Sequence, residues 1–225
     1  LYNIYYKKIV KKKDIYTPKE NIIRETEKDI IEDNIDFVVI NKKSGLPVQG
    51  GTKIKENVIN ILSNSDLFKD DNPYIVHRID KDTSGVLIIA KNRTTAQQLT
   101  TLFRIRKIYK TYLAISFGYL DKKKEIINNN LIRYEGSKKI LEKAITNYKI
   151  VDSNKKYTLF KLNPITGRKH QIRKHLVDLE CPIIGDKKYY IKKPGINTQL
   201  MLHAYEIKFI LNNKKYTFKA KIPDY

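Results

Sequence analysis

The segment HRIDKDTSG holds the densest group of side chains that could do chemistry. His77, Arg78, Asp80 and Asp82 stand within six residues, just before an apolar run. Because a neighbouring arginine favours the ionised form of a carboxyl group, Asp80 could act as a nucleophile or a base. A simpler interpretation also fits, in which Asp80 or Asp82 only caps the turn that precedes a buried strand.

A second dense segment, TGRKHQIRKH, is predicted to turn at its glycine and then become a helix. Arg173 would project beside the buried face of that helix, and Arg168 would lie near its N-terminus, where a phosphate could bind. A solvated basic face explains both arginines equally well. His170 and His175 would point about 140° apart on a helix, which disfavours a shared metal ion.

The third candidate is Tyr112, in the alternating run IYKTYLAISFG. A tyrosine in such a strand belongs to the core more often than to a site, so both interpretations stay open. Elsewhere the segment QGG is too short for a nucleotide-binding loop, and the G-x-S-x-G motif of serine hydrolases is absent from the sequence. The candidates for chemistry are therefore the two charged segments and Tyr112.

The elements that must position these residues follow from hydrophobic periodicity and turn residues. Asn92 is expected to cap a helix, and residues 119–143 are expected to form a hairpin and a loop. Strands are predicted within 36–51 and at 85–92, 108–118, 144–151, 156–164, 200–211 and 214–223, and helices at 56–64, 93–106 and within 166–179. Regular β-α-β alternation is missing, which indicates an α+β fold: a mixed, mainly antiparallel central sheet with flanking helices.

Length and composition suggest one large domain with an appendage. The 225 residues are 41% apolar, enough for a sizeable core. Residues 1–30 are predicted to be a charged arm or the remnant of an upstream module, and residues 31–225 the main domain. No apolar run approaches the length of a membrane span. The single cysteine, Cys181, fits a cytoplasmic location, and a monomer is the default expectation.

The net charge of +21 favours a polyanionic partner, most simply nucleic acid. A chain rich in Lys, Ile, Asn and Tyr could also have become basic by compositional drift. The arginines are more informative, because only 8 of the 45 basic residues are arginine. Arg78, Arg168 and Arg173 all stand in the two dense segments, where lysine could not replace a planar guanidinium that makes two contacts.

Taken together, these segments resemble the RluA-type pseudouridine synthases over about residues 35–225. The resemblance implies that residues 31–225 are the catalytic domain and that residues 1–30 are a charged arm or the remnant of an upstream RNA-binding module. The chain is most similar to the C-type branch, which modifies uridines of large-subunit ribosomal RNA. HRIDKDTSGVLIIAK is similar to the central motif of the family, and KTYLAISFG, ITGRKHQIRKH, PIIGDKKY and LHA follow in the expected order. Two positions depart from the pattern, since Lys43 replaces a proline and Glu180 replaces a glycine.

The resemblance implies a role for each candidate. Asp80 would be the catalytic aspartate, Tyr112 would contact the target base, and Arg173 would pair with Asp80. Arg78 would fill the gap that the extruded uridine leaves. The remaining members would shape or support the substrate site: His77, Arg168, His170 and Gln171.

The implied reaction isomerises specific uridines to pseudouridine in RNA, most simply 23S (large-subunit) ribosomal RNA. It needs no cofactor and no metal, and the partner would be RNA rather than a membrane. Three alternatives remain at this stage. They are a synthase acting on tRNA, a catalytically inactive RNA-binding or ribosome-assembly protein on the same fold, and an unrelated metal-dependent nuclease.

Overall fold

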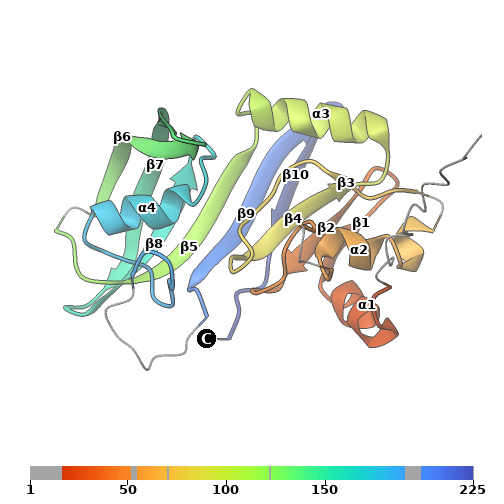
Figure 1. The fold of residues 1–225 in the computed structure, drawn as a ribbon, viewed down its shortest axis with the longest axis horizontal. Helices are drawn as coiled ribbons and strands as arrows, with labels where there is room; N and C mark the ends of the chain where they lie inside the picture. Colours follow the sequence, from red (N-terminus) through yellow and green to blue (C-terminus); the bar gives the residue numbers. More distant parts are fainter. Residues whose placement is uncertain (1–16, 52–54, 70, 122, 191–198, 225) are drawn as a thin grey trace, which may run out of the picture.

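The computed structural model describes residues 17–51, 55–69, 71–121, 123–190 and 199–224. It confirms the predicted fold class, because a ten-stranded sheet carries a small number of helices (Figure 1). Among the described residues, no helix has both the length and the apolar character to cross a membrane. Residues 1–16 of the predicted arm lie outside the described residues, and the proposed division at residue 30 stays a prediction.

The elements follow one another in an irregular order of strands and helices. The helices are α1 (Glu20–Glu27), α2 (Val58–Leu62), α3 (Arg93–Arg104) and α4 (Gln171–Asp178), with a 3₁₀ turn at Asp66–Phe68. The strands are β1 (Ile30–Asp33), β2 (Phe37–Lys42), β3 (Tyr74–Ile75), β4 (Ser84–Ala90), β5 (Tyr109–Phe117), β6 (Lys124–Glu135), β7 (Lys138–Ser153), β8 (Tyr157–Pro164), β9 (Leu202–Leu211) and β10 (Lys214–Lys219).

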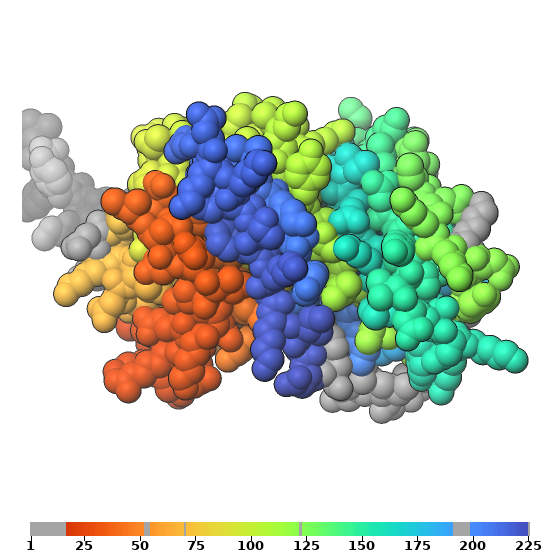
Figure 2. Space-filling model, turned by 180° about the vertical axis from the view of Figure 1, so that it is seen from behind, coloured from red at the N-terminus to blue at the C-terminus, as the bar shows by residue number. Residues whose placement is uncertain are grey.

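The main sheet has the order β1-β2-β4-β9-β5-β8-β7-β6, with β3 paired to β4 and β10 paired to β9. The β4–β9 pair is parallel and the other pairs are antiparallel. Figure 2 shows the reverse side, where the blue C-terminal segment lies between the orange N-terminal half and the green and teal residues of β5–β8. The parallel pair therefore joins the two halves of the sheet, and its β4 residues, Ser84 and Gly85, are the last two of the HRIDKDTSG segment.

Strand β4 is buried along its whole length, which explains its continuous apolar sequence. Its alternate side chains belong to two separate cores. Val86 and Ile88 pack with Leu99 of α3, whereas Leu87 and Ile89 pack with the α2 side. Asn92 caps α3 as predicted, because its side-chain oxygen accepts the backbone N–H of Thr95 at 2.9 Å.

A glycine is required where β4 begins. Gly85 has φ +110°, and a Cβ atom there would lie 2.2 Å from the carbonyl oxygen of Ala204 in β9. No side chain fits at that distance, so glycine lets the two parallel strands meet. This is the physical reason for the glycine between the charged loop and the apolar run.

Residues 119–143 differ in part from the prediction of a hairpin and a loop. They contain all of β6 and the start of β7, which pair over twelve positions from Lys124↔Lys149 to Glu135↔Lys138. The polar run NNN lies inside β6. It forms a strand because β6 is an edge strand with one open face, where polar side chains are tolerated. The hairpin is confirmed, and the loop is shorter than expected, because of the described residues only 119–121, 123 and the turn at 136–137 lie outside the strands.

The chain leaves α4 through Glu180, two residues beyond the end of the helix, and this residue departs from the family pattern. Glu180 has φ +58°, the region where glycine is favoured, and Cys181 N–H donates to Leu176 O at 2.8 Å. We expect Glu180→Gly to raise the free energy of unfolding by about 0.5–1 kcal/mol, because it relieves this backbone conformation at some cost in chain entropy. Urea unfolding would measure the change, and a lower stability would contradict this explanation.

Candidate active site

The HRIDKDTSG loop is fixed to its surroundings by backbone groups rather than by its carboxylates. The carbonyl oxygen of Asp80, not its side chain, accepts the N–H of Thr83 at 3.1 Å and closes the turn. The hydroxyl of Ser44 donates to the carbonyl of Asp82 at 2.7 Å. The Asp80 carboxylate is therefore not spent on this turn, and its side chain is 30% exposed.

A buried lysine that the sequence analysis did not single out holds the same loop. Lys42, at the end of β2, is fully buried, and its ammonium donates to the carbonyls of Lys43, Leu46 and Lys81 at 2.8–2.9 Å. Burial lowers the pKa of Lys42 to about 7, while the charges of Asp82 and Asp80 oppose that shift. Three carbonyl acceptors match the three donors of an ammonium group, so Lys42 ties the turn after β2 to the Asp80 loop.

His77 anchors the start of the loop. Its Nε2 accepts the backbone N–H of Ile88 in β4 at 2.9 Å, and its ring stacks on Phe103 of α3 with centroids 4.5 Å apart. Burial, followed by the charge of Lys110, lowers the pKa of His77 to about 3. The imidazole is therefore neutral at physiological pH, and it continues the hydrogen bonding of β4 beyond the end of β3.

Arg173 reaches Asp80 from α4. Its Nη1 lies 3.6 Å from Asp80 Oδ2, and only 6% of its side chain is exposed. The rest of the guanidinium is held by Asp186, whose oxygens accept from Nε at 2.8 Å and from Nη2 at 2.7 Å. Asp186 also accepts the backbone N–H groups of Lys188 and Tyr189. A buried carboxylate thus fixes the arginine that faces Asp80.

His170 lies on the other oxygen of Asp80. Its Nε2 is 3.7 Å from Asp80 Oδ1, and its Nδ1 lies 2.8 Å from the hydroxyl of Tyr189. Burial lowers the pKa of His170, although the charge of Asp80 opposes this, and burial raises the pKa of Tyr189. A neutral tautomer with the proton on Nε2 accepts from the tyrosine hydroxyl and turns its N–H toward Asp80.

Tyr112 satisfies both interpretations of a strand tyrosine. It is partly buried and packs against two of the cores, and its side chain also lines the same cavity as Asp80. Beside it the pairing of β5 with β9 shifts, from Thr111↔Glu206 to Tyr112↔Ala204, so β9 carries one extra residue. Such a bulge changes the direction of neighbouring side chains. Burial, with the charge of Asp80, raises the pKa of Tyr112, so its phenol keeps the proton.

Gln171 and Arg168 connect the turn before α4 to β7. Gln171 accepts from the Thr166 hydroxyl and the Arg168 N–H, and it donates to the carbonyl of Ile145 and the hydroxyl of Thr146. These bonds use its side chain fully, so Gln171 supports the turn.

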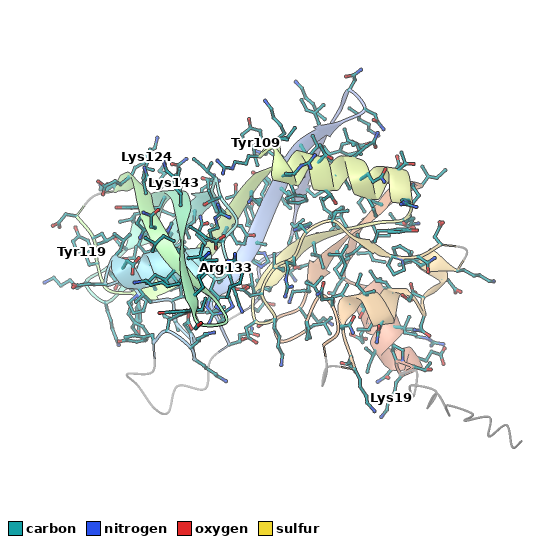
Figure 3. All side chains as sticks on the ribbon, turned by 45° about the horizontal axis from the view of Figure 1, so that its top comes forward. Lys19, Tyr109, Tyr119, Lys124, Arg133 and Lys143 are labelled. Atoms are coloured by element: carbon teal, nitrogen blue, oxygen red, sulfur yellow. The ribbon has the colours of Figure 1, made fainter. Side chains whose placement is uncertain are left out.

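Arg168 donates to the carbonyl of Lys143 and to Glu142, which also lies 3.7 Å from Arg133 Nε. Arg133 belongs to β6 and Lys143 to β7, and Figure 3 shows both on the hairpin that these strands form. The β6–β7 hairpin therefore borders the site.

A cavity of about 520 Å³ unites the predicted residues. All eight of them line it: His77, Arg78, Asp80, Tyr112, Arg168, His170, Gln171 and Arg173. A second cavity of about 650 Å³ shares Arg78 and Asp80 with the first and adds further lysines. The distances from the Asp80 oxygens to Arg173 Nη1 (3.6 Å) and to His170 Nε2 (3.7 Å) both exceed hydrogen-bond length. The lone pairs of Asp80 are therefore available to a reacting group.

The two histidines weighed as a metal pair have separate environments. His170 faces Asp80, whereas His175 is fully buried in α4. In the part of the chain that the structure describes, groups of three or more His, Cys, Asp or Glu side chains able to hold a metal ion are absent.

Comparison with known proteins identifies the family of the chain and supports its fold. The sequence model of the RNA pseudouridylate synthase family matches residues 36–178, and the chain belongs to that family.

Among individual proteins, it is 38% identical to the ribosomal large subunit pseudouridine synthase C of Buchnera aphidicola, over 83% of this chain and 63% of that protein. It is 35% identical to the protein of the same name from Rickettsia felis, over 87% of this chain and 68% of that one. The resemblance drawn from the motifs is thus confirmed.

Solved structures agree. Human RNA Pseudouridylate Synthase Domain Containing 4 superimposes with a TM-score of 0.76 and 27% identity, over 90% of this chain and 92% of that one. The chain spans about two thirds of the length of the curated relatives named above.

Proposed function

We propose that this chain isomerises uridine to pseudouridine in RNA, with large-subunit ribosomal RNA as its substrate. The observation that carries the proposal is the position of Asp80, a partly exposed carboxylate between Arg173 and His170 in a cavity that Tyr112 also lines. The names of the curated relatives support the choice of ribosomal RNA. That substrate and the single cysteine favour a cytoplasmic location, and we take the acting form to be a monomer.

The target uridine would leave its base stack and enter the cavity, which costs a few kcal/mol. The ring of Tyr112 would contact the base, and Arg78, exposed at the mouth of both cavities, would fill the space left in the RNA. His77, Lys42 and Gln171 would hold the loop and the turn in place without touching the substrate. The binding of RNA would thus depend on a rigid frame built before the nucleotide arrives.

The reaction would break the C1′–N1 bond, rotate the base, and form a C1′–C5 bond. The C5 proton leaves and N1 gains one, so atoms and charge balance without a redox partner. Asp80 could attack the sugar or the base, or remove a sugar proton. Each route needs the charge of Asp80 to persist in the cavity, and Arg173 supplies the opposing positive charge at 3.6 Å.

The direct test uses an unmodified transcript of large-subunit ribosomal RNA. Incubation with the purified chain should produce pseudouridine at one or a few uridines, detected by chemical mapping of the RNA. Cells without the gene should lack pseudouridine at the same positions. If the transcript stays unmodified over a range of Mg²⁺ and salt concentrations, the proposed activity is wrong.

Tyr112 gives a second test. Tyr112→Phe keeps the ring that contacts the base and removes only the hydroxyl, so we expect the half-saturating RNA concentration to change little. If the hydroxyl assists proton transfer at C5, kcat should fall about a hundredfold. An unchanged kcat would show that the hydroxyl has no part in the reaction. Tyr148→Phe, in the core of the β7–β8 side, is a control for the loss of a tyrosine hydroxyl elsewhere.

A further inference from the structure

Arginine is concentrated around the main cavity. The chain has 37 lysines and 8 arginines, and among the residues that the structure describes the cavity is lined by five of the arginines and one lysine, Lys110. The five are Arg78, Arg104, Arg106, Arg168 and Arg173. Three of these belong to the motifs already described. Arg104 and Arg106 lie outside those motifs, and the proposed reaction gives them no role.

These two arginines stand where α3 ends and the chain turns toward β5. Figure 1 shows the C-terminal end of α3 above the start of β5, and Tyr109 lies exposed at this end in Figure 3. Both arginines are exposed, and neither forms an ion pair with a carboxylate among the described residues. Arg168 and Arg173, by contrast, are held by Glu142 and Asp186. The two guanidinium groups are therefore charges on the cavity without a carboxylate partner in the described part of the chain.

The backbone at Arg106 closes the helix. Its φ is +59°, its N–H donates to Phe103 O at 3.2 Å, and the N–H of Lys107 donates to Leu102 O at 2.9 Å. This is the left-handed ending that glycine adopts most readily. The turn could form with glycine alone, so it does not explain why residue 106 has a long basic side chain.

The helix dipole does not explain the arginines either. A positive charge near a helix C-terminus is favourable, but lysine provides it as well as arginine does. Lys107, at the same helix end, already supplies such a charge and does not line the cavity. What arginine adds is a planar fork that binds two oxygens of one phosphate.

We infer that Arg104 and Arg106 bind phosphate groups of the RNA strand next to the nucleotide held at Asp80. The inference rests on the proposed function and adds the residues that bind the phosphate backbone of the RNA. Neighbouring nucleotides must leave the cavity at its rim, and each carries one negative charge. The second cavity shares Arg78 and Asp80 with the first and is lined by Lys169 and Lys188. The strand would therefore run from the end of α3, past Asp80, into the second cavity.

Arg106→Gly tests the inference without disturbing the turn. The melting temperature should be unchanged or up to about 2 °C higher, because glycine suits this backbone conformation. The half-saturating concentration of the ribosomal RNA transcript should rise about tenfold. The rate at saturating RNA should stay as in the wild type. The slope of log(kcat/KM) against log salt should become shallower by about 0.7–0.9, the value for one lost phosphate contact.

Lys107→Ala is the matched control, since it removes the same charge one residue away, outside the cavity. It should leave the half-saturating concentration within about twofold and keep the salt slope. Arg104→Lys, which keeps the charge and loses the fork, should weaken the use of RNA several-fold. The inference is overturned if Arg106→Gly behaves like Lys107→Ala, or if Arg106→Gly lowers the melting temperature together with the rate at saturation.

The two proposals fail in different ways. If the wild type makes no pseudouridine, the proposed function fails, and the phosphate contact is then judged from direct RNA binding by the same variants across a salt series. If the wild type is active and Arg106→Gly uses RNA as well as Lys107→Ala does, only the phosphate contact is wrong.

Discussion

Asp80→Asn should make no detectable pseudouridine while binding the same RNA within about twofold of the wild type. Asparagine keeps the shape of the side chain, so the loop tied down by Lys42 and the turn closed at Thr83 should persist. It removes the negative charge that faces Arg173 and His170, and with it the proposed nucleophile or base. Loss of such a group costs far more than the tenfold to hundredfold effects expected at the supporting residues.

Single-turnover conversion at saturating RNA, read by pseudouridine mapping, would measure this loss. Asp82→Asn is the control, because it makes the same chemical change two residues along, at an exposed side chain. We expect Asp82→Asn to react at nearly the wild-type rate. Measurable turnover by pure Asp80→Asn would contradict the catalytic role of Asp80, and loss of RNA binding would show that Asp80 shapes the site instead.

Much of the fold could be predicted because its signals are local. The apolar run of β4, the cap at Asn92 and the alternation of β5 each reflect burial or hydrogen bonding within a few residues. The extent of the β6–β7 hairpin is harder to predict, because an edge strand with an open face has no strong apolar pattern. Its length follows from pairing between residues up to 25 positions apart, which local periodicity does not report.

Some residues of the candidate site could likewise be predicted from local sequence, and others could not. The two charged segments could be found because several reactive side chains are close in sequence. Lys42 could not, since lysine is normally exposed and its three carbonyl partners come from two separate loops. Asp186 and Tyr189 lie in the segment PIIGDKKY, whose order fits the family, but their contacts with Arg173 and His170 depend on tertiary packing. The position of this segment in the sequence was the signal for both residues, and it assigned no role to Asp186 or Tyr189.

Asp186 is the supporting residue whose removal should have the largest effect. Its side chain is fully buried and it binds Arg173 through two hydrogen bonds. Burial opposes its ionisation, but the bonds from Arg173 and from the backbone outweigh burial and lower the pKa of Asp186. Asp186→Asn removes the charge and places an amide group against the guanidinium, so we expect a loss of about 3–5 kcal/mol in the free energy of unfolding.

Urea unfolding at neutral pH would measure this loss, with Glu206→Gln as the control. Glu206 pairs with Lys208 and Lys219, which are half exposed, so its replacement should cost no more than about 1 kcal/mol.

The pH dependence distinguishes the charge from the shape of Asp186. Because the pKa of Asp186 is lower in the folded protein, its contribution is present above the usual value of 3.8 and is lost as the pH falls through the folded value. The stability of wild type and Asp186→Asn should therefore converge in acid.

A folded Asp186→Asn protein should also lose turnover, because Arg173 is then no longer held in place at 3.6 Å from Asp80. Two outcomes would show that Asp186 does not position Arg173: equal stability at neutral pH, or a destabilised variant that still reacts at the wild-type rate below its unfolding transition. The second outcome would mean that Asp80, rather than Asp186, keeps the guanidinium of Arg173 in place.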